Sequence, residues 1–155
     1  IVTGAPTFIN CTVADNKATI GKAGGVFDDG GEAVLRNSIF WSNTSPVAGA
    51  NEIYNPASGA VRTTVSYSVV KGGWPGEGNL NSDPLFVDPA AGDYRIRETS
   101  PCKDKGQNAF LPQDVGDINL EGNTTEVLPK DLNLKPRIHG DSVDMGAFEW
   151  HPPSE

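Results

Sequence analysis

Residues 10–16 read NCTVADN, and the same pattern returns at residues 37–43 as NSIFWSN, 27 positions further along the chain. A looser copy, YSVVKGG at residues 67–73, follows after another 30 positions. A second pair of segments, GGVF at 24–27 and NEIY at 51–54, keeps the offset of 27, and a cluster of turn-forming residues follows each of them. A fixed period of this size is typical of proteins built from stacked repeats.

Each repeat has room for two or three strands of about five residues with turns between them, and such strands close a repeat only by winding around an axis. Successive repeats then pair in parallel, and crossovers between parallel strands are almost always right-handed. Inward side chains form continuous ladders, and we expect Val13, Phe40 and Val70 to share one ladder or its neighbour. The predicted fold class is all-β: a right-handed parallel β-helix of about three coils over residues 1–73.

Asn10 and Asn37 occupy equivalent positions just before a repeated strand. An amide at this place can bond to the coils above and below as well as to its own turn, so we interpret both residues as structural. The alternative is glycosylation, since Asn10, Asn43 and Asn123 each begin an acceptor sequence. A buried ladder position would exclude Asn10 as an acceptor.

After Gly73 the repeat is lost. Residues 74–150 are expected to form an irregular, loop-rich C-terminal cap packed on the last coil, and residues 151–155 a tail. A stacked fold needs such a cap because an uncovered last coil exposes unpaired strand groups and apolar residues. The sequence predicts two strands in it, one within DPLFVDP at 83–89 and a final one at 143–150.

Five segments in order carry a family resemblance: NCTVADN at 10–16, DPLFVDP at 83–89, GDYRI at 92–96, SPCKDKG at 100–106 and VDMGAFE at 143–149. Together they resemble bacterial surface proteins with parallel β-helix repeats and a "choice-of-anchor Q" C-terminal region. The resemblance covers nearly the whole chain. It implies a secreted or cell-surface β-helix of a kind often described as adhesins or polysaccharide-acting proteins, and it implies no single chemistry.

The chain departs from this family in two respects. The family usually has many coils before this ending, whereas about three are present, so the chain resembles a fragment or a shortened relative. The edge of the first coil is expected to be open unless another domain, a partner or a local cap covers it. We expect self-association there, with the segment from Phe8 to Val13 pairing with a second copy or an N-terminal neighbour. In KDLNLKPR at 130–137, Leu134 and Lys135 stand where the family has Gly and Asn, which puts a tight turn in question.

The composition excludes several classes of partner. Acidic residues outnumber basic residues by 20 to 12 and no basic cluster occurs, so nucleic acid is not an expected partner. No apolar run approaches the length of about 20 residues that a membrane span needs. Cys11 and Cys102 are too few for a disulfide scaffold or a cysteine zinc site, and we expect two unpaired thiols, with a disulfide between them as the alternative.

Aromatic residues near the repeats are the candidates for ligand binding. An outward-facing set can form a platform for sugar rings, and its members would be Trp41, Tyr54, Tyr67 and Trp74. Because side chains alternate along a strand, Phe40 inside the coil would place Trp41 outside. The alternative is that these rings pack loops.

A turn in the cap is the candidate metal site. Asp117, Asn119 and Glu121 place oxygen ligands at alternate positions before Gly122, which imitates the start of an EF-hand loop and suits calcium. The twelfth position is Leu128 instead of a bidentate glutamate, so an ordinary hydrophilic turn is the alternative. No cofactor other than calcium is expected.

Three functions remain open. The first is a non-catalytic extracellular or cell-surface module that presents a rigid face to a polysaccharide or a protein surface. The second is a polysaccharide lyase or glycoside hydrolase, which needs acids and bases clustered on one outer face. The third is a structural cap or anchor without a ligand. The acids and bases considered for the enzyme are Arg36, Arg62, Lys71, Asp28, Asp29, Glu32 and Glu52, and no catalytic residue is assigned.

Overall fold

The computed structural model describes residues 4–56, 63–117, 120–128 and 130–153. Within these ranges the chain is all-β, with short strands, two 3₁₀ helices and no α-helix, and no helix is long and apolar enough to cross a membrane. The strands are β1 (Thr7–Ile9), β2 (Thr12–Ala14), β3 (Val26–Phe27), β4 (Val34–Arg36), β5 (Ile39–Trp41), β6 (Ile53–Tyr54), β7 (Thr64–Ser66), β8 (Val69–Val70), β9 (Phe86–Asp88) and β10 (Asp93–Ile96), and the 3₁₀ helices are η1 (Pro89–Ala91) and η2 (Asn108–Phe110).

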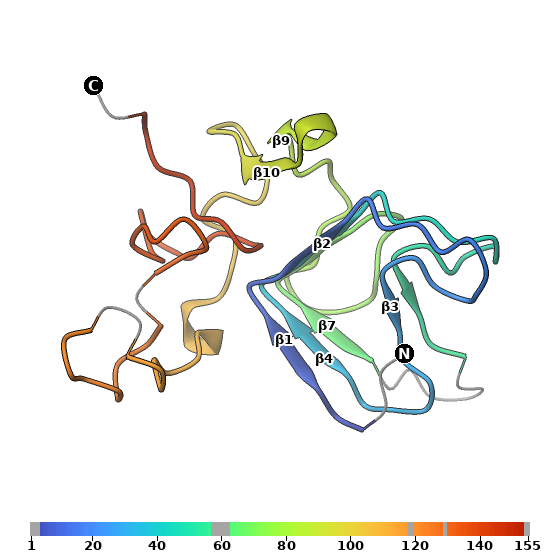
Figure 1. Ribbon diagram of the computed structural model, residues 1–155, viewed down its shortest axis with the longest axis horizontal. Helices are drawn as coiled ribbons and strands as arrows, with labels where there is room; N and C mark the ends of the chain where they lie inside the picture. Colours follow the sequence, from blue (N-terminus) through green and yellow to red (C-terminus); the bar gives the residue numbers. More distant parts are fainter. Residues whose placement is uncertain (1–3, 57–62, 118–119, 129, 154–155) are drawn as a thin grey trace.

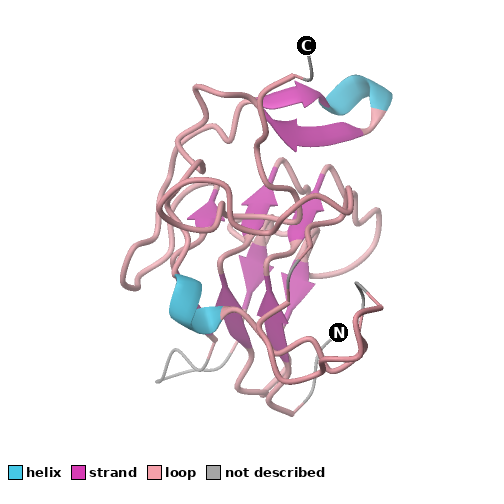
Figure 2. Ribbon diagram, turned by 90° about the vertical axis from the view of Figure 1, so that its left-hand side faces the viewer, coloured by secondary structure: helices cyan, strands magenta, loops and turns pink. Residues whose placement is uncertain are grey.

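Three parallel sheets with the orders β1-β4-β7, β2-β5-β8 and β3-β6 make up the first half of the chain. Thr12 pairs with Ile39, and Ile39 pairs in turn with Val69, so the offsets of 27 and then 30 residues are confirmed. The strands therefore form three stacked layers, β1 to β3, then β4 to β6, then β7 and β8. Figure 1 shows the sheets around a common interior, and Figure 2 shows their strands side by side.

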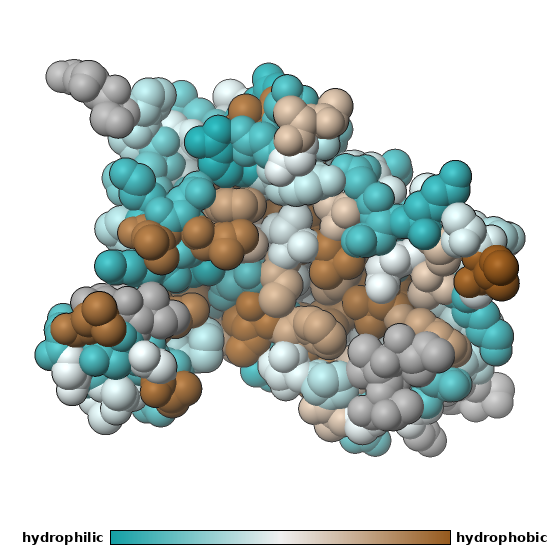
Figure 3. Space-filling view, viewed as in Figure 1, coloured by the Kyte–Doolittle hydropathy of each residue, from teal (hydrophilic) through white to brown (hydrophobic). Residues whose placement is uncertain are grey.

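Apolar side chains fill this interior. Val13 is opposite Phe40 and Phe40 is opposite Val70, which confirms the predicted ladder. Phe40 has no exposed surface, whereas Val13 in the first layer is only half-buried. The other buried members of this cluster are Val26, Ala33, Leu35, Ile53 and Val65. In Figure 3 apolar residues gather over the middle of the molecule, with hydrophilic residues along much of its rim.

A second apolar cluster lies on the outer face of the β2-β5-β8 sheet. Because side chains alternate along a strand, Ile39 and Val69 face away from Phe40 and Val70. They pack against Phe86, Ile96, Cys102 and Met145 of the C-terminal half. Most of this half therefore lies beside the three layers, as Figure 1 shows.

Residues 74–82 lie over the third layer. The N–H of Tyr67 donates to the carbonyl of Glu77, and the N–H of Val70 donates to the carbonyl of Leu80. Trp74 packs against the interior cluster. The expected cap thus consists of a short cover over the last layer and a longer segment along the flank.

Three corners between the first two sheets adopt the same conformation. Asn10, Asn37 and Tyr67 have φ values of 51°, 49° and 48°, a left-handed backbone that asparagine tolerates better than most residues. Directly after the second and third corners, a serine hydroxyl oxygen accepts an N–H of the layer before it. The N–H of Cys11 donates to Ser38 Oγ (3.1 Å) and that of Ser38 to Ser68 Oγ (3.0 Å).

The predicted amide stack between Asn10 and Asn37 is wrong. Both side chains bond to the flanking segment instead: Asn37 exchanges two hydrogen bonds with the backbone of Gln107, and Asn10 Nδ2 donates to the carbonyl of Asp144. An amide pair between layers does form at Asn16 and Asn43 (2.9 Å). Because Asn10 and Asn43 are both buried, their side chains are not accessible for glycosylation.

The predicted strand at 85–87 is present as β9, and β9 and β10 pair in an antiparallel hairpin. The predicted strand at 143–150 is wrong, since these residues form turns around two buried carboxylates. Asp144 accepts the N–H groups of Asp104 and Trp150 (2.6 Å each), and Glu149 accepts those of His139 (2.9 Å) and Asp144 (3.0 Å). Side-chain bonds to the backbone replace the ladder of a sheet there.

A tight turn does form at residues 131–135, even though glycine is absent. Asp131 Oδ1 accepts the N–H groups of Asn133 and Lys135, and Leu134 itself adopts φ +60°. A leucine thus holds a left-handed conformation that costs a residue with a Cβ about 1–2 kcal/mol. The side chain of Leu134 is exposed.

Candidate functional site

Trp41, at the end of β5, has the orientation that strand alternation predicts. Phe40 faces the interior, while Trp41 packs against the second apolar cluster on the outer face of the sheet. The indole is half-buried, and the ammonium group of Lys71 lies 5.5 Å from its centroid. This distance is within the range of a cation–π interaction.

Two hollows meet beside Trp41, and we call them together the Trp41 groove. One has a volume of about 430 Å³, and the other, of about 460 Å³, shares Ser42 with it. The first is lined by Asp15, Trp41, Ser42, Asp83, Leu85, Phe86, Pro89, Arg97 and Thr99, and the second by Ser42, Asn43, Thr44, Asn51, Glu52, Lys71 and Gly72. The walls carry both polar and apolar side chains, and two aromatic residues, Trp41 and Phe86, line the first hollow.

Glu52 is the buried carboxyl group of this groove. Its Oε2 accepts hydrogen bonds from Asn43 Nδ2 (2.5 Å) and from the N–H of Asn43 (3.3 Å). Burial raises the pKa of Glu52, and the bonds from Asn43 and the charge of Lys71 oppose this rise. A carboxyl group with a raised pKa beside an ammonium group can donate a proton or bind a sugar hydroxyl.

The other three predicted aromatic residues do not form a single platform with Trp41. Tyr54 packs on Phe27, with 5.7 Å between the ring centroids. Tyr67 packs edge-on against Phe110, and its hydroxyl donates to a carboxylate oxygen of Glu77 (2.8 Å). Trp74 covers the third layer and lines a further hollow with Glu52 and Lys71. Of the four predicted aromatic residues, Trp41 and Trp74 are the two that lie near Lys71, one beneath its ammonium group and one in the same hollow.

Most of the acids and bases considered for an enzyme lie apart. The guanidinium group of Arg36 stacks over Phe110, 4.3 Å from the ring centroid. Asp28 is fully buried and accepts hydrogen bonds from the N–H of Ala33 and the hydroxyl of Thr63, so it has a structural role. Arg62 lies outside the described residues. Glu52 and Lys71 are the pair that lines a common hollow.

The predicted calcium loop is only partly described, because Asn119 lies outside the described residues. Asp117 Oδ1 accepts the N–H groups of Glu121 (3.0 Å) and Gly122 (3.2 Å). Within the described ranges no group of three histidine, cysteine or acidic residues is placed to hold a metal. Calcium binding at this turn stays a prediction. Both cysteines are free thiols, as predicted, and burial raises the pKa of Cys102 to about 12.

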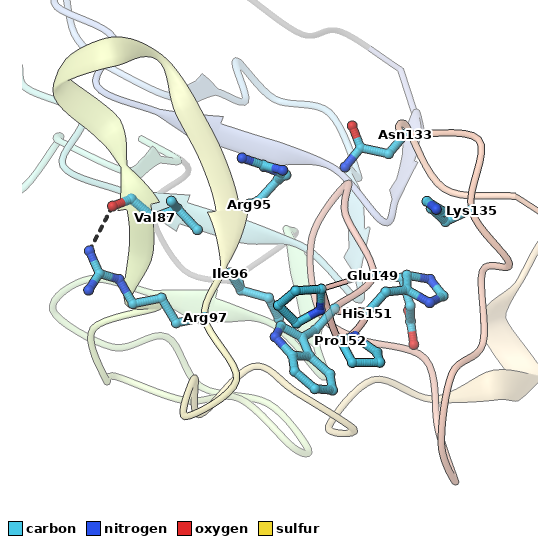
Figure 4. A pocket seen from close by; sticks show the side chains of 11 residues that line it. Val87, Arg95, Ile96, Arg97, Asn133, Lys135, Glu149, His151 and Pro152 are labelled. Atoms are coloured by element: carbon cyan, nitrogen blue, oxygen red, sulfur yellow. Dashed lines mark hydrogen bonds between the residues drawn. The ribbon is translucent and has the colours of Figure 1, made fainter. Parts of the chain in front are cut away.

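Another hollow, which the sequence did not predict, lies between β10 and the C-terminal residues (Figure 4). We call it the basic hollow because Arg95, Arg97, Lys135 and His151 line it. Its volume is about 330 Å³. The available signal was the pair of arginines on either side of Ile96, but nothing in the sequence shows that residues some 40 positions later lie beside them.

Glu149 also lines the basic hollow and is the most perturbed carboxyl group in the described chain. Burial raises its pKa to about 8, and the charge of Asp144 adds to this rise. The N–H groups of Asp144 and His139 and the charge of Arg137 act in the opposite direction. The raised pKa keeps much of the Glu149 population neutral at pH 7.

Comparison with known proteins finds no matching family model, no matching curated protein and no matching solved structure.

Proposed function

We propose that the chain is the end module of an extracellular, right-handed parallel β-helix, and that it is a non-catalytic module binding a glycan in the Trp41 groove. The parallel sheets, with register offsets of 27 and 30 residues, support the proposed fold. A stack of short parallel strands is rigid because every layer is hydrogen-bonded to its neighbours. Such a module presents its outer face without rearrangement.

The two ends of the stack support the role of an end module. Residues 74–82 cover the third layer, and Asn79 accepts the N–H of Ser68 there. Among the described residues, β1, β2 and β3 each pair with a strand on one side only. Unpaired strand edges are templates for a further layer. The open edge is thus the proposed place of contact with a preceding layer or a second copy of the chain.

One observation carries the proposal of glycan binding: an outward-facing tryptophan lines one of two neighbouring hollows that share Ser42. Aromatic faces bind the apolar faces of ring-shaped ligands, and a few convergent polar groups fix the orientation of the ligand. Asp15, Asp83, Asn43 and Lys71 supply such donors and acceptors along the groove.

The test is a glycan array followed by calorimetry on the purified chain and two variants. Trp41→Ala should abolish binding, because it removes the aromatic face. Tyr54→Ala is the matched control, since Tyr54 is another half-buried strand aromatic on a different sheet, and it should leave binding unchanged. Binding that survives Trp41→Ala, or a chain that binds no glycan, would refute the proposal.

A polysaccharide lyase or hydrolase is the second candidate, and the proximity of Glu52 to Lys71 is the observation that favours it. Burial raises the pKa of Glu52, as an acid catalyst requires. Incubation with uronate-rich polysaccharides, followed at the ultraviolet absorbance of unsaturated products and by reducing-end release, distinguishes the candidates. Product formation that Glu52→Gln abolishes would replace the binding module with an enzyme.

A further inference from the structure

We propose that the basic hollow is a second ligand site and that it binds a carboxylate or sulfate group carried on a sugar ring. The basic hollow and the Trp41 groove share Arg97, whereas Lys135 and His151 line the basic hollow and not the groove. The proposal rests on the charges, the fixed geometry and the apolar lining of the hollow between β10 and residues 133–153 (Figure 4).

The charge of the hollow is opposite to that of the chain. The chain has a formal net charge of −8 and 12 lysine and arginine residues in all. Three of them, Arg95, Arg97 and Lys135, line this one hollow together with His151. Cations brought together from two distant segments raise the local potential and attract anions to a surface that otherwise repels them.

Arg97 has a fixed position among these cations. Its Nε donates to the carbonyl of Phe86 (3.1 Å) and its Nη2 to the carbonyl of Val87 (2.7 Å). Both acceptors are neutral backbone groups of β9, so the hairpin holds the guanidinium group in place without neutralising it. The remaining N–H groups can bind two oxygens of an anion in parallel, as guanidinium groups do with carboxylates and sulfates.

Lys135 and Arg95 differ in how much charge they offer. The backbone N–H of Lys135 is fixed by Asp131, and its ammonium group has no ion-pair partner among the described residues. Arg95 is paired with Asp93 on the surface, so its charge is largely compensated. Lys135 is therefore the expected principal contact of the anion, and Arg97 adds positive charge on the β10 side of the hollow.

Asn133, His151 and Glu149 complete the polar lining. His151 Nε2 lies 3.1 Å from the carbonyl of Pro136, so Nε2 carries the proton and donates it there. Both oxygens of Glu149 face the backbone N–H groups of His139 and Asp144. Because these donors and the raised pKa of Glu149 reduce its negative field, the one carboxyl group in the hollow opposes an anion only weakly.

The rest of the lining is apolar and selects the kind of anion. Val87, Ile96, Trp150 and Pro152 line the hollow next to the cations. A bare inorganic ion would leave these surfaces without a partner, whereas a sugar ring covers them while its acidic group reaches Lys135. The volume of about 330 Å³ is at the lower end of ligand pockets, which suits one or two rings.

The test is isothermal calorimetry with three probes: a galacturonate trisaccharide, a sulfated heparin disaccharide and neutral maltotriose. The galacturonate probe, the sulfated probe or both should bind, which identifies the acidic group, and maltotriose should not. Binding of inorganic sulfate as tight as that of the saccharides would overturn the role of the apolar lining. Equal binding of maltotriose would overturn the role of the charges.

Two charge reversals locate the site. Lys135→Glu should weaken binding of the acidic saccharide by about tenfold or more, since it replaces a charge-assisted bond with repulsion. Lys105→Glu is the matched control: Lys105 is exposed and does not line the hollow, so the same change in net charge should alter affinity less than about twofold. Equal effects of the two variants would refute the site. Trp41→Ala should leave this binding intact, which separates the result from that of the Trp41 groove.

Discussion

Replacing Leu134 with glycine should stabilise the protein, although it removes a large side chain. Leu134 adopts φ +60°, which costs a residue with a Cβ about 1–2 kcal/mol. Glycine avoids this cost but loses about 0.5–1 kcal/mol through the greater freedom of its unfolded state. Since the leucine side chain is 68% exposed, little apolar burial is lost. The expected net gain is about 0.5–1 kcal/mol, or a rise in Tm of about 1–4 °C for a chain of this size.

Leu132 provides a matched control in the same turn. It is 67% exposed and has a negative φ, so Leu132→Gly gains nothing and should cost about 0.5–1 kcal/mol. Urea denaturation followed by tryptophan fluorescence measures both variants under identical conditions. The sign of the difference is the decisive result. Equal destabilisation by the two substitutions would refute the left-handed conformation at Leu134.

Three further predictions concern the core, the corners and the buried acids. Phe40→Ala should cost about 3–5 kcal/mol in urea denaturation, because Phe40 is fully buried at the centre of the interior cluster, and a loss below about 1 kcal/mol would contradict that placement. Ser38→Ala should lower the free energy of unfolding by about 1–3 kcal/mol, because the N–H of Cys11 loses its acceptor. Cys11→Ser should lower it by less than about 1 kcal/mol, since a serine hydroxyl can donate to the carbonyl of Ile9 as the thiol does. Equal losses would contradict the row of hydrogen bonds between layers. The pKa of Glu149 is 4.5 in the unfolded chain and about 8 in the folded chain, so between these values the folded state holds one more proton. The free energy of unfolding should therefore fall as pH rises from about 5 to 8. Glu149→Gln should flatten that fall in urea midpoints measured at pH 5 and pH 8, and an unchanged slope would show that Glu149 is already ionised.

The repeated half of the fold is predictable because its stability comes from a periodic pattern. Val13, Phe40 and Val70 recur at the offsets of the repeat, and strand alternation then fixes which side Trp41 faces. The corner asparagines follow the same period but contact residues 70 and 134 positions away. Their partners have no period, so the sequence indicated a stack between layers that does not form.

The structure of the flanking segment, residues 83–153, could not be predicted from the sequence for a different reason. Besides apolar residues, it buries carboxylates that accept backbone N–H groups, as Asp144 and Glu149 do, and no regular spacing in the sequence indicates such bonds. The basic hollow is built in the same way: Arg97 and Lys135 are separated by a long loop-rich stretch and meet only in the folded chain. A charge count of the chain as a whole gives the opposite sign from the charge of this hollow.

The contacts between the flanking segment and the corners impose an order on folding. The three layers depend on partners about 30 residues apart, so they can assemble as soon as residues 1–82 have left the ribosome. The bond from Asn10 to Asp144 closes a loop of 134 residues and has to wait for nearly the whole chain. Until then Ile39 and Val69 lie uncovered on the outer face of the sheet. During synthesis, the apolar stripe around Ile39 and Val69 is therefore exposed before its partners are available, and exposed stripes of this kind favour aggregation. Residues 83–153 cover the stripe once they fold onto the sheet.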